Sequence, residues 1–247
     1  MAWDLKSIES ALMDANRSQA QEYFAGLVWK KLQAEMCDIM ADECIPTAWE
    51  SVRNLPGVAL YAPPLAARIA TLAQASAHVL YSMGDTLAQC VNVVCDLQID
   101  EQDVSFAKVR GMLRSKDDLS RISTAMADLE HAEWFLYYGA FANITKHRTI
   151  IASSRGMSPD HTEMVVRFHG FTYTSKRDKV TREYEPRLAR DLLKCGRDEV
   201  VGLVGLAWDA LERHLEAHVP QEAPCGVHCG LGCPAKRQPA MCSVSAK

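Results

Sequence analysis

The longest regular pattern of apolar positions in the chain lies between residues 65 and 97. This stretch contains no proline and only one glycine, Gly84, and Pro64 stands where a helix can begin. The pattern predicts a single helix over 65–97, roughly 45–50 Å long at 1.5 Å per residue. Because apolar residues surround most of its circumference, we expect this helix to be buried.

Shorter stretches with helical spacing flank this segment. Leu5, Ile8 and Leu12 predict a short amphipathic helix, and a second helix is expected over 18–40 with Phe24 and Val28, and also Leu32, on one face. Pro46 is expected to end that pattern, and a short helix follows over 47–54. Further helices are predicted over 104–113, 119–129, 134–151 and 183–218, and the second and third of these either continue or kink near Glu133.

The period of the pattern changes between residues 163 and 174. After a loop over 153–159, Glu163 to Phe168 and Phe171 to Thr174 resemble strands, and His169 and Gly170 supply the turn of a β-hairpin near 163–175. The predicted fold is therefore mainly α, a helical bundle with a small β-hairpin insert. We expect an N-terminal helical segment packed on the bundle, the helical domain itself, and a Cys/Gly/Pro-rich, poorly ordered tail, over residues 1–60, 61–219 and 220–247.

Composition narrows the class of protein but not its function. The net charge is −4, so bulk charge does not favour a broad nucleic-acid or membrane surface, although it leaves room for a local basic patch. The first residues lack the basic start and apolar run of a signal peptide, and no stretch has the length of a membrane span. We therefore expect a cytoplasmic protein that does not enter the membrane. In that compartment, five of the nine cysteines are expected to be small buried hydrophobes: Cys37, Cys44, Cys90, Cys95 and Cys195.

A stripe of polar residues runs along the long predicted helix. His78, Ser82, Asp85, Gln89 and Asn92 are separated by 4, 3, 4 and 3 residues, which places them on one side of the helix. One interpretation is an ordinary solvent-facing side. The other is a buried hydrogen-bonding network, because the stripe lacks Lys, Arg and Glu and mixes a carboxylate, amides, a hydroxyl and an imidazole.

A second polar group follows a run of aromatic residues. Asn143 and His147 are four residues apart and share a helix face, and Lys146 and Arg148 flank the histidine. Two cations beside an imidazole and an amide suit an anionic group such as phosphate. The alternative is a histidine satisfied within the core, which is more common than a catalytic one.

Metal sites receive weaker support from the sequence. Asp128 and His131 have i, i+3 spacing and His214 and His218 have i, i+4 spacing, but no Glu-x-x-His pair of a ferritin-like centre is present. The tail contains Cys225-x-x-His228-Cys229-x-x-x-Cys233, with Cys242 beyond, which lacks the paired Cys-x-x-Cys spacing of a zinc knuckle. We expect no metal and no cofactor.

The Asn143-x-x-Lys146-His147-Arg148 segment, after an aromatic helix, resembles the HEPN superfamily of helical domains, and most closely a group of uncharacterised bacterial HEPN-like proteins. The resemblance covers roughly residues 65–218, and in it the helix bearing His78, Asp85, Gln89 and Asn92 packs near the Asn-x-x-Lys-His-Arg helix. It implies a domain that often dimerises and that either cleaves RNA without metal or only binds nucleotides or RNA. Asn143 and His147 match two motif positions, but Ala142 stands where the family has arginine.

Two functional hypotheses follow from the resemblance and the residues. In the first, the chain is a ribonuclease or an RNA- or nucleotide-binding protein of a bacterial defence or toxin-type system. His147 then exchanges the proton, Lys146 or Arg148 stabilises the phosphorane, and Asn143 orients the substrate. In the second, the chain is a non-catalytic helical module that dimerises or binds a partner, and the missing arginine favours this hypothesis. The expected partners are RNA or a nucleotide and a second copy of the chain.

Overall fold

The computed structural model describes residues 18–53, 62–147, 151–157, 164–175 and 178–218. The short helix predicted near the N-terminus and the Cys/Gly/Pro-rich tail lie outside these residues.

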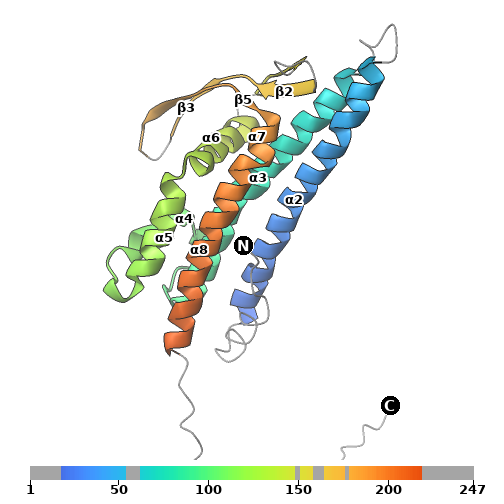
Figure 1. The fold of residues 1–247 in the computed structure, drawn as a ribbon. Helices are drawn as coiled ribbons and strands as arrows, with labels where there is room; N and C mark the ends of the chain where they lie inside the picture. Colours follow the sequence, from blue (N-terminus) through green and yellow to red (C-terminus); the bar gives the residue numbers. More distant parts are fainter. Residues whose placement is uncertain (1–17, 54–61, 148–150, 158–163, 176–177, 219–247) are drawn as a thin grey trace, which may run out of the picture.

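Two long helices form the spine of the molecule. Helix α2 (Ser18–Arg53) and helix α3 (Ala62–Val94) lie side by side along most of their lengths (Figure 1). Helices α4 (Phe106–Leu113) and α6 (Glu133–His147) pack on another side of α3, and α5 (Ser120–His131), which lies between them in sequence, packs mainly on α8. After the strands, α7 (Ala189–Leu193) and α8 (Cys195–His218) return along the bundle. Two short 3-10 turns, η2 (Glu101–Asp103) and η3 (Asp117–Leu119), join the shorter helices.

Helix α2 packs through a heptad seam of mostly small residues. Its buried apolar positions are separated by 4, 3, 7 and 7 residues, a heptad spacing that keeps one face against a neighbouring helix: Ala20, Phe24, Leu27, Ala34 and Ala41. Asp38 lies on the same face, is only 8% exposed, and forms an ion pair with Arg197 of α8. The prediction that Pro46 ends this helix is wrong, because α2 continues to Arg53. The predicted face is also only partly right, since Leu32 is exposed.

Helix α3 is the centre of the bundle, as its apolar circumference predicts. It contacts α2, α4, α6, α7 and α8, and its second half is buried on several sides. Two glycines allow aromatic rings to come close where α3 crosses α6. A Cβ atom at Gly84 would lie 2.6 Å from the Phe135 ring, and one at Gly139 would lie 2.8 Å from the Tyr81 ring.

The strands form two small sheets at one end of the bundle (Figure 1). In the first sheet, β2 (Met164–Phe168) lies between β1 (Ser153–Met157) and β5 (Arg187–Leu188), and both pairings are antiparallel. The second sheet is a hairpin of β3 (Phe171–Thr174) and β4 (Thr181–Tyr184).

The predicted β-hairpin near 163–175 has the right strands but the wrong pairing. Strands β2 and β3 belong to different sheets, and Gly170 is the joint between them. A Cβ atom at Gly170 would lie 2.8 Å from the carbonyl oxygen of Tyr184, so the glycine permits a close approach of two chain segments. The expected loop over 153–159 contains strand β1, and the helix predicted from residue 183 begins only at Ala189.

The mainly α fold with a small β insert is confirmed. Of the two alternatives near Glu133, a continuous helix or a kink, the structure has the break: α5 ends at His131 and α6 begins at Glu133. Within the described part of the chain, none of the helices combines the length and the apolar character that crossing a bilayer requires.

Candidate functional site

The polar stripe on α3 divides into parts with different surroundings. At its C-terminal end, the buried Asn92 side chain binds both backbone groups of Ile99: Nδ2 donates to the carbonyl at 2.9 Å, and Oδ1 accepts from the N–H at 3.2 Å. Gln89 Nε2 donates to the carbonyl of Glu101 at 3.1 Å. These two amides hold the segment that follows α3, so this end of the stripe has a structural role.

The other end of the stripe connects α3 to its neighbours. The Nε2 atom of His78 lies 2.9 Å from Oγ1 of Thr145 on α6. Lys30 of α2 donates to the Oγ atom of Ser82 at 2.9 Å and to the Ser82 carbonyl at 3.0 Å. In the middle of the stripe, between Ser82 and Gln89, the side chain of Asp85 is exposed. The buried-network interpretation therefore holds for part of the stripe, and the solvent-facing interpretation holds for Asp85.

Three basic side chains gather at this end, one from each of three helices: Lys30, His78 and Lys146. Burial lowers the pKa of Lys30, the carboxylate of Asp85 opposes this shift, and the Lys146 charge adds to it. Burial, with a further contribution from the Lys146 charge, lowers the pKa of His78 below 6.5. The imidazole is therefore neutral at pH 7, and the two ammonium groups repel each other.

Asn143 lies at the boundary between this cluster and a cleft. It is half-buried, and its Nδ2 donates to the carbonyl of Gly139 at 2.7 Å. It also hydrogen-bonds the Tyr81 phenol, whose pKa is raised chiefly by burial and also by the Asp85 charge. Lys146 follows three residues later on α6 and is exposed.

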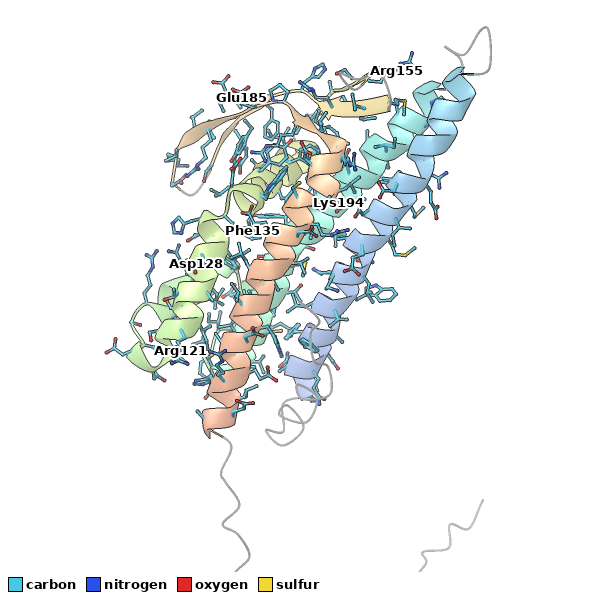
Figure 2. The ribbon with its side chains drawn as sticks, viewed as in Figure 1. Arg121, Asp128, Phe135, Arg155, Glu185 and Lys194 are labelled. Carbon is cyan, nitrogen blue, oxygen red and sulfur yellow. The ribbon has the colours of Figure 1, made fainter. Side chains whose placement is uncertain are left out.

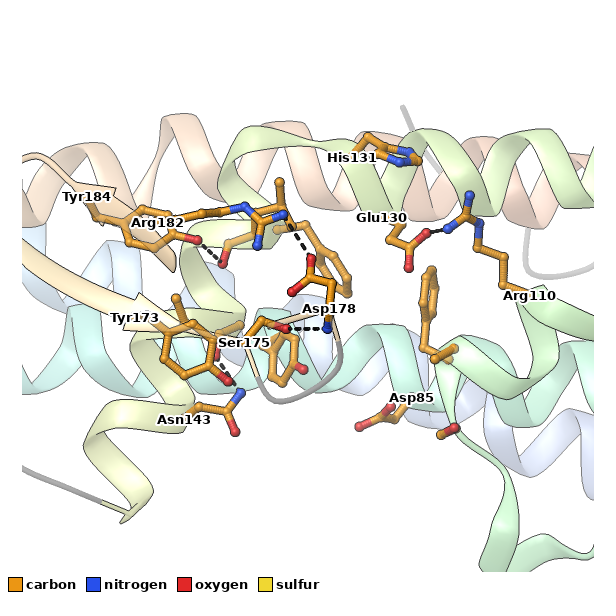
Figure 3. Close-up of a pocket in the computed structure, with 18 residues that line it drawn as sticks. Asp85, Arg110, Glu130, His131, Asn143, Tyr173, Ser175, Asp178, Arg182 and Tyr184 are labelled. Atoms are coloured by element: carbon orange, nitrogen blue, oxygen red, sulfur yellow. Dashed lines mark hydrogen bonds and ion pairs between the residues drawn. The ribbon is translucent and has the colours of Figure 1, made fainter. Parts of the chain in front are cut away.

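The cleft has a volume of about 540 Å³ and lies between the helices and the β3–β4 hairpin (Figure 3). Helices α3, α4, α5 and α6 supply its walls, and the hairpin supplies the remaining side. Five aromatic side chains line it: Tyr81, Phe106, Phe135, Tyr173 and Tyr184. Polar or charged side chains make up much of the remaining lining, so the cleft is amphipathic, and a concavity of this size is the usual form of a small-molecule site.

Aromatic packing fixes the hairpin against α6. The rings of Phe171 and Tyr184 stack with centroids 5.0 Å apart, and both rings contact Tyr137. The Tyr184 hydroxyl donates to the carbonyl of Leu136 at 3.3 Å. Side chains alternate between the two faces of a strand, so Tyr173 and Arg182 lie on the same face of the hairpin as Phe171 and Tyr184, and both line the cleft.

The charged groups in the cleft largely pair with one another. Arg110 forms an ion pair with Glu130, and Arg182 forms one with Asp178 at 3.2 Å (Figure 3). The hydrogen bond from Ser175, with further help from the Val180 N–H, lowers the pKa of Asp178 to about 2, so this carboxylate stays ionised. The arginines in the cleft are therefore held in ion pairs, whereas Lys30 in the basic cluster feels both the carboxylate of Asp85 and the positive charge of Lys146.

The structure brings some of the predicted site residues together and leaves others undescribed. Asn143 and Asp85 line the cleft, and His78 and Lys146 belong to the basic cluster beside it. His147 is the last residue of α6, but its side chain lies outside the described residues, as does the whole of Arg148. Ala142, at the position of the family's arginine, is only 1% exposed and lies in the core.

Sequence reasoning missed Lys30 and the aromatic residues of the hairpin, because they are distant in sequence from the motifs. One signal was present in the distribution of charge. Residues 146–194 contain 11 Lys and Arg against 6 Asp and Glu, a net charge of +5, whereas the whole chain carries −4. This basic segment includes the end of α6 and all the strands.

The residues with metal-ligand spacing in the sequence do not form a metal site within the described part of the chain. Asp128 is exposed on α5, at the opposite side of the bundle from α2 (Figure 2), and Nδ1 of His131 lies 2.7 Å from the carbonyl of Ala127. In the described ranges, no group of three or more His, Cys, Asp or Glu residues has the arrangement of a metal site. The Cys225 to Cys233 motif lies outside those ranges.

Comparison with known proteins adds no relative: no family model, curated protein or solved structure matches the chain.

Proposed function

We propose that this chain binds a nucleobase-containing ligand, either a short single-stranded RNA or a nucleotide. The base occupies the aromatic cleft, and a phosphate lies against Lys30 and Lys146. One observation carries the proposal: the cleft and the basic cluster meet at Asn143. This residue lines the cleft and lies one helical turn from Lys146 of the basic cluster.

The cleft suits a planar ring. Tyr81 and Tyr173 stand on opposite elements, α3 and β3, and the amide of Asn143 and the carboxylate of Asp85 lie on the same lining. A base stacked on an aromatic side chain contributes about 1–3 kcal/mol of binding free energy. Amide and carboxylate groups can hydrogen-bond the edge of a base, which fixes its orientation.

The phosphate is assigned to the basic cluster and not to the arginines in the cleft. Arg110 and Arg182 are paired with carboxylates, so a phosphate there would have to displace Glu130 or Asp178. Lys30 and Lys146 instead repel each other, and the carboxylate of Asp85 offsets that repulsion only at Lys30, so an anion between the two ammonium groups would be attracted by both. The net charge of +5 over residues 146–194 extends a favourable field for further phosphates.

The proposal is binding without cleavage. A ribonuclease of the HEPN type would use the motif arginine, but the side chain at position 142 faces the core. The histidine of the basic cluster, His78, is kept neutral by burial and by the Lys146 charge, and its Nε2 is engaged by Thr145. RNA incubated without metal is therefore expected to stay intact, and an Asn143→Ala, His147→Ala double variant should leave this result unchanged.

The binding test is a fluorescence titration of labelled single-stranded RNA, with AMP and GMP as competitors. Tyr173→Leu removes the stacking surface and should weaken binding about tenfold, corresponding to about 1.4 kcal/mol. Lys146→Ala removes a phosphate contact, so it should weaken binding several-fold and reduce the slope of log K against log salt by about 1.

Two control variants separate these effects from general damage. Arg121→Ala removes an exposed positive charge on α5, outside the basic segment (Figure 2), and Thr174→Ala changes the exposed neighbour of Tyr173 on β3. Both should bind as the parent does. Equal affinities for all five proteins, or no binding by the folded parent, would contradict the proposal.

A further inference from the structure

The outer face of α2 carries a row of exposed apolar side chains. Trp29 is 63% exposed, Leu32 43%, Met36 54% and Ile39 52%. Helix α2 lies at the edge of the bundle and packs on α3 through its opposite side (Figure 1). The row is therefore unpartnered among the described residues, and we call it the α2 outer face.

The spacing and limits of this face suit another helix. The four residues are separated by 3, 4 and 3, which is the spacing of a coiled-coil seam. Ala25 continues the same spacing, no charged residue stands on this line between Ala25 and Ile39, and the exposed carboxylates Glu22 and Glu43 mark its two ends. An apolar stripe that ends in charges at a defined length indicates a partner helix of similar length.

We infer that the α2 outer face packs antiparallel against the same face of a second copy of this chain. Charge decides the direction. In a parallel pair, Glu22 would oppose Glu22 of the partner subunit and Glu43 would oppose Glu43 of the partner subunit, which is unfavourable. In an antiparallel pair centred on the stripe, Glu43 lies beside the partner subunit's Ala25, and no carboxylate faces another.

The antiparallel register also pairs side chains of compatible shape. Centring the two copies midway between Trp29 and Ile39 sets Trp29 against the partner subunit's Ile39 and Leu32 against the partner subunit's Met36. Such a two-fold arrangement uses the same patch on both copies, which is the commonest form of homo-oligomer.

The area available sets the strength of the association. The four side chains expose roughly 400 Å² of apolar surface, which is within the size range of a functional patch on a monomer. A standard interface removes about 800 Å² from each partner. The seam and its flanks therefore support a weak dimer whose population depends on protein concentration.

The test is sedimentation velocity on the full chain over a wide range of protein concentration. The parent should shift from monomer to dimer as concentration rises. Met36→Glu places a charge in the seam and should raise the dissociation constant at least about tenfold. Leu206→Glu is the matched control, because Leu206 is an aliphatic residue of α8 with 48% exposure and lies outside the seam.

A mixing experiment tests the direction. Leu32→Lys and Met36→Glu should each weaken the dimer alone, whereas an equimolar mixture of the two variants should associate. The reason is that the introduced lysine of one copy faces the introduced glutamate of the other copy only in the antiparallel register. A parent that stays monomeric, or a dimer that resists Met36→Glu as well as Leu206→Glu, would overturn the inference. The first result would leave the face to the N-terminal 17 residues or to a different protein.

Discussion

Replacing Asn92 with alanine should destabilise the fold far more than its place in a polar stripe suggests. Its side chain makes two hydrogen bonds, at 2.9 and 3.2 Å, to the carbonyl and N–H of Ile99, a residue that is only 8% exposed. The variant loses both bonds and leaves the two backbone groups without these partners in a buried place.

The magnitude follows from the two contributions. Each hydrogen bond contributes about 0.5–1.5 kcal/mol, and each buried polar group left unpaired costs about 1–3 kcal/mol. Water that reaches Ile99 after truncation recovers part of this loss, so we expect the free energy of unfolding to fall by about 2–4 kcal/mol. Gln89→Ala is the matched control on the same stripe, because it loses one solvent-accessible bond of 3.1 Å and should cost about 0.5–1 kcal/mol.

The assay is urea unfolding followed by circular dichroism, with the slope m compared between variants to verify that the extent of unfolding is unchanged. RNA binding by both variants should match the parent, since neither amide lines the cleft. A loss below about 1 kcal/mol for Asn92→Ala, or losses of equal size for the two variants, would refute the assignment of a structural role to this end of the stripe.

Three further predictions concern stability. Gly84→Ala should lower the melting temperature, at a cost of about 1–3 kcal/mol, because the added Cβ would lie 2.6 Å from the Phe135 ring; an unchanged melting curve would contradict this contact. Gly202→Ala in α8 should raise stability by about 0.5–1 kcal/mol in urea unfolding, since no atom lies within 4 Å of its Cβ position, and a destabilised variant would be inconsistent with that space. The pKa of His78 is lowered below 6.5 in the folded chain, so the unfolded chain takes up this proton more readily. The contribution of the neutral imidazole to the free energy of unfolding is therefore fully present above pH 6.5, and it is lost as the pH falls from 6.5 towards the folded-state pKa. His78→Gln keeps a hydrogen-bonding group for Thr145 and should flatten that pH dependence, whereas identical pH profiles would argue against a neutral imidazole.

The helices could be predicted where one local signal dominates. The run from 65 to 97 has no internal breaker and matches α3 closely, whereas the pattern near Glu133 leaves open whether the helix continues or kinks. At Pro46 the local signal for a break is overridden, and α2 continues to Arg53. Apolar spacing predicts that α2 is amphipathic but assigns Leu32 to the core, because a helix with apolar residues on two faces has no unique buried side.

Strand pairing could not be predicted, because it depends on contacts between distant residues. A glycine between two apolar strands is the ordinary signal of a hairpin turn. Here Gly170 instead permits contact with the backbone at Tyr184, a residue that the sequence pattern assigns to a helix. The true partners of the two strands, β1 and β4, lie in segments of weak apolar character.

The candidate site was predictable only in part for the same reason. The motifs identify Asp85, Asn143 and Lys146 because each belongs to a helix with clear periodicity. Lys30 contributes from α2 and Tyr173 from the hairpin, and no local pattern connects either residue to the others. The cleft exists only because the second sheet folds against α6, which sequence spacing does not encode.

The most direct test of the proposed function is to map where a bound base lies. Single-stranded RNA containing 4-thiouridine would be photo-crosslinked to the parent protein, and the modified peptides would be identified by mass spectrometry. The proposal predicts crosslinks in the peptides that contain Tyr81, Asn143 and Tyr173, and their loss when unlabelled nucleotide competes. Crosslinks confined to other surfaces, such as α5 or the outer side of α8, would contradict a base-binding cleft.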